Sequence, residues 1–347
     1  MIRLFLKKGD KFVKYNVAII GAGLIGKKRA KALCSQKNCT LVAVADINKA
    51  AACDLAQEFE GKAYFRWEDV VSRDDIDIVI VSTSNNFLAP VSIAALNSKK
   101  HVLCEKPLGR NSNESYKIVQ AAEKNKCFLK TGFNHRHHSA IWQAKQLASA
   151  GEIGLLHYIR CIYGHGGRPG YEKEWRASKK ICGGGEMLDQ GVHVVDLFRW
   201  FMGDFSFAFG YTPTYVWPMQ VEDNAFVLFK DKKGKIGLMQ TSWTQWKNRF
   251  NFEVYGEKGY LIVNGLGGSY GKETLILGKR NKHAGPPDEK VFEFEGKDIS
   301  WRLEWEEFIK AIQEKREPLG NGKDGYQALR MIEAAYRSSK SGKVIKI

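Results

Sequence analysis

The stretch YNVAIIGAGLIGKKRAKAL at residues 15–33, followed by LVAVAD at 41–46, decides the fold. An apolar run ends in the glycine-rich segment 21–26, a helical pattern follows, and the next apolar run ends in Asp46. Beyond Asp46, short apolar runs alternate with helical patterns as far as residue 132. Continuous apolar strands that alternate with helices indicate an α/β domain with a parallel sheet covered on both faces.

The glycine-rich segment has the spacing that a dinucleotide phosphate requires. Gly21 allows a tight turn, Gly23 lets the backbone approach a pyrophosphate, and Gly26 lets the helix pack against the sheet. The helix N-terminus, with the N–H groups of Leu24 and Ile25, offers a positive dipole end to the phosphates.

Asp46 lies 20 positions after Gly26, the offset of a carboxylate that reaches the adenosine ribose. It can accept hydrogen bonds from both ribose hydroxyls and would repel a 2′-phosphate. We therefore predict a Rossmann domain that binds NAD in preference to NADP. A glycine-rich turn without a ligand is the alternative.

The pattern changes in the second half of the chain. From about residue 156, two-residue alternation around the turns 231–234 and 256–259 predicts hairpins and a largely antiparallel sheet. One helix is predicted from about Gly185 to Met202, and others follow at 301–315 and 325–340. We predict a dinucleotide-binding domain at 1–135 and a second domain at 136–347, with the closing helix 325–340 able to pack back on the first.

Length, charge and cysteine content limit the function classes. The 347 residues correspond to roughly two domains at about 150 residues each. The net charge of +16 is scattered, and no nucleic-acid-binding motif collects it, so we expect no nucleic-acid partner. No apolar run approaches the ~20 residues that span a bilayer, which predicts a soluble chain without a membrane partner. Seven dispersed cysteines without a CxxC pair or a secretion signal predict reduced thiols and a cytoplasmic location.

The segment Cys104-Glu105-Lys106-Pro107 follows the end of a predicted parallel strand. Open α/β sheets bind ligands at that edge. A lysine there can hydrogen-bond a substrate hydroxyl or favour its alkoxide. Taken alone, Lys106 is equally compatible with a solvated surface side chain.

The segment GGGEMLDQGVHVVD at 183–196 contains a possible acid/base pair. Asp189 and His193 are four apart, so on the predicted helix they share a face. A carboxylate beside an imidazole orients it and stabilises its protonated form, which suits proton transfer near neutral pH. The helix is apolar, so Asp189, His193 and Asp196 need partners or a cavity, whereas a surface ion pair is the alternative. The glycines at 183–185 are expected to let backbone approach a ligand.

The stretch NHRHH at 134–138 suggests a metal site, but no cysteine or carboxylate accompanies it at ligand spacing. We predict no metal. Asn134 and Arg136 are the preferred cofactor or substrate contacts, and His137 is a candidate pocket residue.

Together these motifs resemble the glucose-fructose oxidoreductase, inositol dehydrogenase and rhizopine catabolism (Gfo/Idh/MocA) family. The segments that carry the resemblance are GAGLIG at 21–26, STSN at 82–85, CEKPL at 104–108, GFNHR at 132–136 and GGGEMLDQGVHVVDL at 183–197. The resemblance implies a Rossmann domain and an α/β domain with a large open, mostly antiparallel sheet. In this family that sheet commonly forms the interface of an oligomer, which implies a homodimer or homotetramer.

The resemblance also implies roles for particular residues. His193 would take a proton from the reacting hydroxyl while hydride passes to the nicotinamide, Asp189 would tune His193, and Lys106 would hold the substrate oxygen and stabilise developing negative charge. Beyond the glycine loop and Asp46, the implied cofactor contacts are Thr83, Asn85, Glu105, Lys106, Asn134, Trp175 and Arg176. The implied substrate contacts are Lys106, Arg136, Arg176, Asp189 and His193.

Three positions depart from the family pattern. Ser84 stands where a proline is common, Leu88 where a histidine is common, and His137 where an aromatic residue is common. These departures concern contacts around the nicotinamide and substrate rather than the catalytic trio. The basic stretch before the first predicted strand is assigned no role.

The leading hypothesis is an NAD-dependent dehydrogenase that oxidises a secondary hydroxyl of a sugar or reduces the corresponding ketone. Arg168, Arg176, Lys179 and Lys180 favour a phosphate- or nucleotide-bearing sugar. A cyclitol dehydrogenase and an enzyme that retains NAD and uses it transiently, as some glycosidases do, are the enzyme alternatives. An NAD-binding regulatory protein is the non-enzyme alternative.

Overall fold

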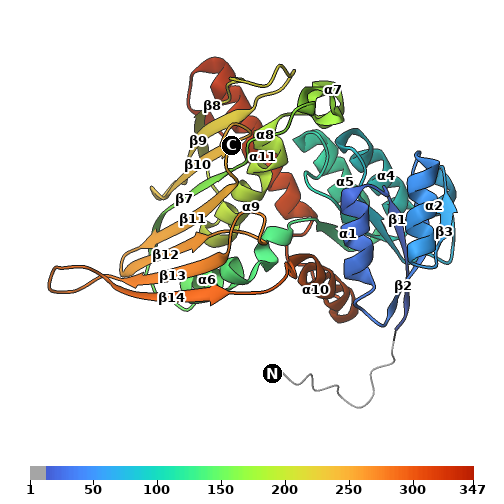
Figure 1. Ribbon diagram of the computed structural model, residues 1–347, viewed down its shortest axis with the longest axis horizontal. Coiled ribbons are helices and arrows are strands. Elements are labelled where there is room, and N and C mark those ends of the chain that lie inside the picture. Colours follow the sequence, from blue (N-terminus) through green and yellow to red (C-terminus); the bar gives the residue numbers. More distant parts are fainter. Residues whose placement is uncertain (1–12) are drawn as a thin grey trace, which may run out of the picture.

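The computed structural model describes residues 13–347. The basic N-terminal stretch noted above lies mostly outside these residues. Residues 15–131 contain a six-stranded parallel sheet in the order β3-β2-β1-β4-β5-β6 (Figure 1). Its strands are β1 (Tyr15–Ile20), β2 (Cys39–Ala45), β3 (Lys62–Tyr64), β4 (Ile78–Val81), β5 (His101–Cys104) and β6 (Leu129–Thr131). Its helices are α1 (Leu24–Leu33), α2 (Lys49–Glu58), α3 (Glu68–Val71), α4 (Asn85–Asn97) and α5 (Ser112–Asn125).

This strand order is that of a Rossmann domain, which confirms the predicted fold. All four residues of β4 are buried, as expected where helices cover both faces of a parallel sheet. The order reverses between β1 and β4, and ligands of such sheets bind where the carboxyl ends of the strands separate.

The turn after β1 needs two of its glycines. Gly21 has a φ of 103°, and a Cβ there would lie 2.4 Å from the Ser82 carbonyl oxygen. A Cβ on Gly26 would lie 2.0 Å from the Gly21 oxygen. Any side chain at either position would therefore displace α1 from the sheet.

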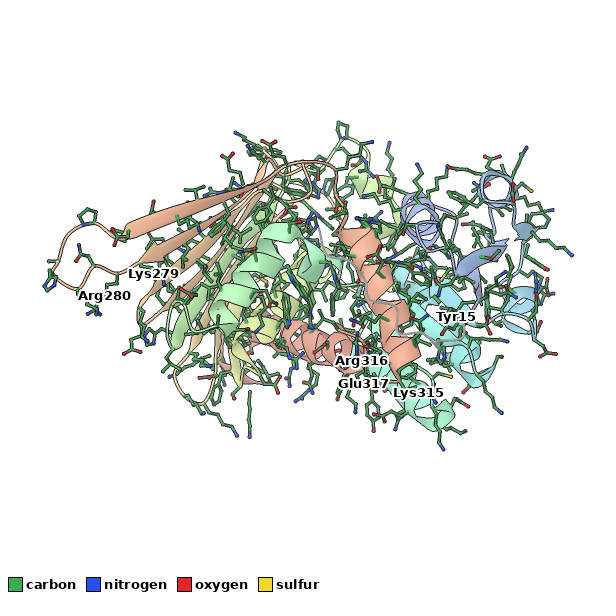
Figure 2. The ribbon with its side chains drawn as sticks, turned by 90° about the horizontal axis from the view of Figure 1, so that it is seen from below. Tyr15, Lys279, Arg280, Lys315, Arg316 and Glu317 are labelled. Atoms are coloured by element: carbon green, nitrogen blue, oxygen red, sulfur yellow. The ribbon has the colours of Figure 1, made fainter. Side chains whose placement is uncertain are left out.

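Residues 156–346 contain a nine-stranded sheet in the order β14-β13-β12-β11-β7-β10-β9-β8-β15. Its strands are β7 (Leu156–Gly164), β8 (Phe207–Tyr211), β9 (Asn224–Lys230), β10 (Ile236–Ser242), β11 (Arg249–Gly256), β12 (Gly259–Asn264), β13 (Glu273–Lys279), β14 (Asp288–Phe294) and β15 (Ile345–Lys346). Neighbouring strands are antiparallel except β7 and β10, which run parallel. The predicted mostly antiparallel sheet and both predicted hairpins are confirmed. Figure 2 shows the β13–β14 hairpin reaching beyond the neighbouring strands, with Lys279 and Arg280 toward its far end.

Two elements, η1 (Asn134–His137) and α6 (Ser139–Ser149), connect the two sheets. Three short elements follow β7 within the second half: η2 (Tyr171–Lys173), η3 (Trp175–Ala177) and α7 (Lys179–Cys182). Helix α9 (Gly191–Met202) packs on the inner face of the second sheet against β7 and β10. The carboxyl edge of the first sheet therefore faces segments that belong to the second.

Two C-terminal helices return to the first sheet. Helix α10 (Ser300–Glu314) packs on α1, and its Trp305 and Phe308 join a core with residues of β1 (Figure 1). Helix α11 (Gly322–Ser341) packs against α5 on one side and against α9 and β8 on the other. The closing helix thus touches both sheets, and α10 is a contact between them that the sequence did not predict.

The single helix predicted from Gly185 to Met202 is wrong. The segment contains α8 (Glu186–Asp189) and α9, which meet at Gln190. A Cβ on Gly191 would lie 3.3 Å from Met187 and 3.5 Å from Met239, so the glycine lets α9 begin close against the sheet. Asp189 and His193 consequently lie on two helices rather than on one face of one helix.

No helix between residues 13 and 347 is both long and apolar enough to cross a bilayer. Over the same range, no group of three or more His, Cys, Asp or Glu side chains is placed to hold a metal ion. All seven cysteines are free, and four of them are buried.

Candidate active site

The structure brings Lys106 and Asp189 together from positions 83 residues apart. Lys106 follows β5, and Asp189 ends α8. The Lys106 ammonium donates to Asp189 Oδ1 at 2.8 Å and to the Asp189 carbonyl oxygen at 2.6 Å. Both side chains remain partly exposed, at 19% and 28%. The pair therefore lies at the carboxyl edge of the first sheet and is accessible.

The Asp189 carboxyl is held in its ionised form. Burial by itself would raise the pKa of this carboxyl. The positive charges of Lys106 and Arg176 outweigh burial and lower the pKa to about 2. Arg176 Nε lies 3.7 Å from Asp189 Oδ2. At neutral pH the carboxylate thus balances the Lys106 charge and fixes the direction of its ammonium.

His193 lies beside this pair in the first turn of α9 and is 4% exposed. Its ring stacks on His135, with ring centroids 3.7 Å apart and planes 13° apart. Burial first, and then the Lys106 charge, hold the His193 pKa well below its ordinary value. The imidazole is therefore neutral at pH 7 and can accept a proton.

The expected pairing of Asp189 with His193 does not occur. The Asp189 carboxylate bonds Lys106, and no hydrogen bond in the described part of the chain joins it to the His193 ring. The physical reason is that Lys106 and Arg176 engage the Asp189 carboxylate. The His193 ring stacks on His135, and its Nδ1 has no hydrogen-bond partner among residues 13–347.

A chain of hydrogen-bonding groups lies behind His193, and sequence reasoning missed most of it. His135 Nε2 lies 3.2 Å from the Tyr163 hydroxyl. The Tyr163 and Tyr270 rings meet edge to face at 5.0 Å, and Gln190 Nε2 donates to the Tyr270 hydroxyl at 2.7 Å. Each group comes from a different element, so the only sequence signal was the clustering of histidines at 134–138.

Glu105, a predicted cofactor contact, belongs to a buried ion-pair network. Arg29 of α1 donates to Glu105 at 2.6 Å and to Glu304 of α10 at 2.6 Å. Arg29 and Glu304 are 1% and 0% exposed. The network ties the residue before Lys106 to α1 and α10, so it positions the Lys106 segment. Neither Arg29 nor Glu304 carried a signal in the sequence.

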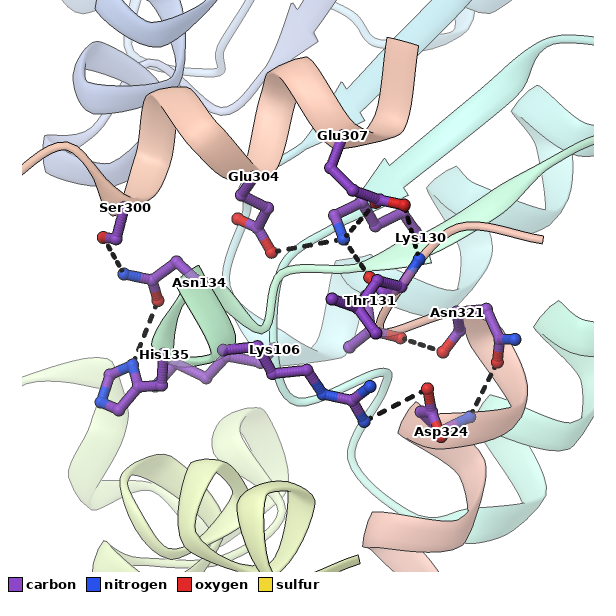
Figure 3. Close-up of polar contacts among 12 residues, drawn as sticks. Lys106, Lys130, Thr131, Asn134, His135, Ser300, Glu304, Glu307, Asn321 and Asp324 are labelled. Carbon is purple, nitrogen blue, oxygen red and sulfur yellow. Dashed lines mark hydrogen bonds and ion pairs between the residues drawn. The ribbon is translucent and has the colours of Figure 1, made fainter. Parts of the chain in front are cut away.

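A second buried cation, Lys130 of β6, pairs with the same helix, α10. Figure 3 shows Glu304 and Glu307 pointing from α10 toward Lys130. Their carboxylate oxygens Oε1 and Oε2 lie 3.9 and 3.3 Å from the Lys130 Nζ. The Lys130 ammonium also donates to the Leu319 carbonyl oxygen. Because unpaired buried charges are costly, these contacts fix α10 against the first sheet.

Asn134 and Arg136 are held by protein groups. Figure 3 shows the Asn134 amide donating to Ser300 Oγ, while its oxygen lies 3.2 Å from His135 Nδ1. Arg136 is 2% exposed and donates through Nε and Nη2 to Asp196. Its Nη2 also lies 3.2 Å from Asp324. The Arg136 guanidinium is thus engaged by two protein carboxylates, and this geometry lends no support to its predicted contact with the substrate.

The His137 imidazole stacks on Trp142, and the residue lines a pocket with His138 and Ser139 that does not include Lys106 or Asp189. It is 5% exposed, and burial lowers its pKa well below the ordinary value. The structure therefore places His137 in packing between η1 and α6.

The three glycines at 183–185 serve packing within the protein. A Cβ on Gly184 would lie 2.2 Å from the Tyr336 hydroxyl, and one on Gly185 would lie 1.9 Å from the Glu222 carbonyl oxygen. The Glu222 carboxylate accepts hydrogen bonds from the backbone N–H groups of Gly185 and Met187 and from the Tyr336 hydroxyl. We expected these glycines to let the backbone approach a ligand. In the structure they let the start of α8 pack closely against Tyr336 and Glu222.

The residues of the glycine turn fit a dinucleotide. Helix α1 begins after Gly23 without a side-chain cap, so its first N–H groups, including those of Leu24 and Ile25, are available to an anion. A Cβ on Gly23 would meet nothing within 4 Å, which leaves open space over the helix end. Asp46 Oδ2 accepts from the Ala22 N–H at 2.7 Å, so the carboxylate stands beside this turn.

The other predicted cofactor contacts border the same edge. Thr83 Oγ1 lies 3.2 Å from the Ser84 carbonyl oxygen, and Asn85 donates to the Cys182 carbonyl oxygen, which ties α4 to α7. The Arg176 guanidinium lies 4.4 Å from the Trp175 ring centroid and faces Asp189. Trp175 and Arg176 are therefore next to the Lys106–Asp189 pair, whereas the Asn85 amide is engaged in the protein.

Comparisons with known proteins agree with this architecture. Residues 15–133 match the family model described as oxidoreductase family, NAD-binding Rossmann fold. Residues 141–262 match the GFO/IDH/MocA C-terminal domain.

Relatives cover most of the chain. Levoglucosan dehydrogenase of Pseudarthrobacter phenanthrenivorans is 26% identical over 72% of this chain and 73% of its own. Myo-inositol 2-dehydrogenase of Thermotoga maritima is 26% identical over 95% of this chain and 98% of its own. A solved levoglucosan dehydrogenase, in complex with NADH and L-sorbose, shares the fold with a TM-score of 0.89 at 23% identity, covering 96% of this chain and 99% of its own. The two family models together match the first sheet and most of the strands of the second, and the chain belongs to the Gfo/Idh/MocA family of oxidoreductases, with an NAD-binding Rossmann domain.

Proposed function

We propose that this protein is an NAD-dependent dehydrogenase that oxidises a secondary hydroxyl of a sugar or reduces the corresponding ketone. The observation that carries the proposal is the Lys106–Asp189 ion pair beside the neutral His193, at the edge of the sheet that bears the dinucleotide turn. The relatives named above act on levoglucosan and myo-inositol, which are polyhydroxylated rings.

Each member of the trio has a distinct role. NAD, held by the glycine turn and Asp46, would supply the acceptor for the hydride of the reacting carbon. His193 accepts the hydroxyl proton in the same direction, and in ketone reduction it returns that proton. The Lys106 ammonium donates a hydrogen bond to the substrate oxygen and stabilises negative charge there. Asp189 orients Lys106, and the His193 ring stacks on His135.

Two of the four basic residues near the site sequence are paired with carboxylates, and two are exposed and can meet a charged group of the substrate. Of the four basic residues near the site sequence, Arg168 pairs with Glu174 at 2.5 Å, and Arg176 lies between Glu174 and Asp189. Lys179 and Lys180 are exposed and remain available for a phosphate or nucleotide carried by the sugar. A sugar nucleotide is therefore a finer proposal within the same class.

A cyclitol substrate is the second candidate, and the similarity to myo-inositol 2-dehydrogenase over 95% of the chain favours it. The test is turnover of the purified protein with NAD and, in parallel, levoglucosan, myo-inositol and dTDP-glucose, followed by NADH absorbance. We expect NADH to accumulate with at least one sugar. Product formation without net NADH would indicate a retained, transiently used cofactor. NADH binding without turnover of any compound would contradict the dehydrogenase proposal and support a regulatory NAD-binding protein.

Asp46→Asn is expected to shift cofactor preference toward NADPH. The amide keeps an oxygen for the Ala22 N–H but removes the charge that would repel a 2′-phosphate. We expect the ratio of NADH to NADPH affinity to fall about tenfold or more, since hydrogen bonds to charged groups contribute about 1.5–3 kcal/mol. Fluorescence titration measures both affinities. Asp54→Asn, on the exposed side of α2, is the matched control, and an unchanged ratio in Asp46→Asn would contradict the assignment.

We infer that the outer face of the second sheet forms a homodimer or homotetramer interface. Phe226, Leu228 and Leu238 point outward from β9 and β10 and are 38–42% exposed, and Leu228 pairs with Leu238 across the strands. A contiguous apolar face of this kind is typical of an interaction surface. Leu238→Asp should break this interface, so analytical ultracentrifugation should show a lower mass than the wild-type oligomer has. Leu155→Asp, at an exposed leucine before β7, should leave the mass unchanged.

We also infer a cytoplasmic location and a domain division near residue 135. The location is supported by seven free cysteines, since disulfides are common in oxidising compartments. The division is supported by the end of β6 at Thr131 and the start of η1 at Asn134. Helices α10 and α11 then belong to the second domain by sequence and pack on the first.

A further inference from the structure

Glu186 is a buried carboxyl group next to the catalytic residues. It opens α8, one turn before Asp189, and is 0% exposed. Neither of its side-chain oxygens has a hydrogen-bond partner within residues 13–347. The roles proposed above for Lys106, Asp189 and His193 do not use this group. An acidic side chain placed in this manner needs a ligand or a bonding partner.

Two further buried oxygens face the same region without a partner in the described structure. Gln190 follows Glu186 by one helical turn, and its Oε1 is unpaired while its Nε2 donates to Tyr270. Thr241 lies on the inner face of β10, in register with Tyr163 of β7, and its Oγ1 is unpaired. Helix α8 packs on β10, Gln190 bonds the Tyr270 hydroxyl that lies near Glu186, and Thr241 is in register with Tyr163, which also lies near Glu186. We therefore place the three oxygens in one polar region between α8 and the sheet.

The surroundings keep Glu186 neutral. Burial raises its pKa well above the ordinary value, and the nearby Asp189 and Glu222 carboxylates raise it further. The Lys106 ammonium and the neighbouring Ser242 backbone N–H, which does not reach hydrogen-bond geometry with either Glu186 oxygen, lower the pKa but are outweighed. The phenols of Tyr163 and Tyr270, which also face this region, stay protonated because burial raises their pKa values. The region therefore offers O–H donors and oxygen acceptors without a net positive charge.

We propose that Glu186, Gln190 and Thr241 form a substrate subsite that receives a neutral hydroxyl group of the sugar, next to the carbon that reacts. This inference rests on the proposed dehydrogenase function. A hydroxyl both donates and accepts, so it can satisfy an acid O–H and an amide or hydroxyl oxygen together. A substrate carboxylate or phosphate in this subsite would face Asp189 and Glu222. The Lys106 ammonium could not balance its charge, because it is already paired with Asp189. Charged groups of a substrate must therefore point elsewhere.

The first test reads the carboxyl group directly. Infrared spectroscopy of the NADH-bound protein at pH 7 should show the carbonyl stretch of a protonated carboxylic acid that Glu186→Gln removes. Glu222→Gln is the control that distinguishes the Glu186 band from any band of Glu222. Glu222 is a buried carboxyl group nearby that already accepts hydrogen bonds from Gly185, Met187 and Tyr336. Addition of levoglucosan or myo-inositol should shift the Glu186 band. A band that neither sugar moves would overturn the proposal and leave a buried acid bonded to internal water only.

The second test separates substrate binding from chemistry. With a sugar that the wild type oxidises, Glu186→Met should raise KM about tenfold or more, because it leaves the sugar hydroxyl without its partner, and should change kcat less. Glu186→Gln keeps a hydrogen-bond donor and an acceptor, so its KM should lie between those of the wild type and Glu186→Met. An analogue that lacks the bound hydroxyl should bind wild type and Glu186→Met with similar affinity.

The outcomes distinguish this inference from the proposed function. No turnover by the wild type, with NADH bound, refutes the dehydrogenase. Turnover by the wild type with unchanged KM in both Glu186 variants refutes only the subsite. Loss of NADH affinity in parallel with sugar affinity would also overturn the subsite, since it would show a general disturbance of α8.

Discussion

Lys106→Met should lower kcat by about 100- to 1,000-fold, the loss that follows when a single preorganised donor to a developing oxyanion is removed. The Lys106 ammonium is placed by two contacts with Asp189, at 2.6 and 2.8 Å, and remains partly exposed toward the site. Methionine keeps the length of the side chain but has no donor. Steady-state kinetics with NAD and the best sugar of the panel would measure the loss.

The cofactor affinity provides the control for Lys106. We expect NADH binding in Lys106→Met to weaken much less than kcat, because the glycine turn and Asp46 are untouched. Lys117→Met, on the exposed side of α5, removes the same charge far from the pair and should retain wild-type activity. Activity of Lys106→Met close to the wild-type level would remove Lys106 from the chemistry.

His193→Asn should cost about 100- to 10,000-fold in kcat, the range attributed to a positioned acid or base. Asparagine preserves polarity in the buried position but cannot take up the proton. His157→Asn, at an exposed position of β7, is the matched control. A His193→Asn enzyme whose rate recovers with added imidazole would support the assignment, whereas full activity without rescue would contradict it.

The pH dependence gives a second readout for His193. Burial and the nearby Lys106 charge hold its pKa in the folded state well below the ordinary histidine value of 6.5. Wild-type kcat/KM should therefore persist below pH 6.5 and fall only when the buried imidazole is protonated. Below pH 6.5 the unfolded chain binds a proton at this position more readily than the folded chain does. The free energy of unfolding therefore keeps its full value above pH 6.5 and decreases as the pH falls from there toward the pKa of the folded state. Urea unfolding of wild type and His193→Asn across this range would show a shallower acid dependence in the variant.

The sequence by itself determined the parts of the molecule that depend on near neighbours in the chain. The turn at Gly21 and Gly26 follows from local sterics, because a Cβ at either position would strike backbone a few ångströms away. The hairpins around 231–234 and 256–259 follow from alternation and turn residues that are adjacent in the sequence. The motif segments around Lys106 and Asp189 could be recognised, because each is contiguous.

Local pattern was misleading where packing against a distant element competed with it. Helical spacing predicted one helix with Asp189 paired to His193, but the structure has two helices that meet at Gln190, and the Asp189 carboxylate bonds Lys106 from the first sheet. The glycines at 183–185 were expected to face a ligand, yet Tyr336 and Glu222 occupy the space beside two of them. Arg136 was expected at the substrate and is paired with Asp196 instead.

Only the tertiary structure decided which charged groups meet. Lys106 and Asp189 are 83 residues apart, and Arg29 joins Glu105 across 76 residues and Glu304 across 275. Glu186 looked like one more polar residue in a motif until the second sheet buried it beside Thr241. Backbone conformation responds to neighbours within a few residues, whereas the pairing and protonation of buried groups depend on desolvation and on charges that only the folded chain brings within reach.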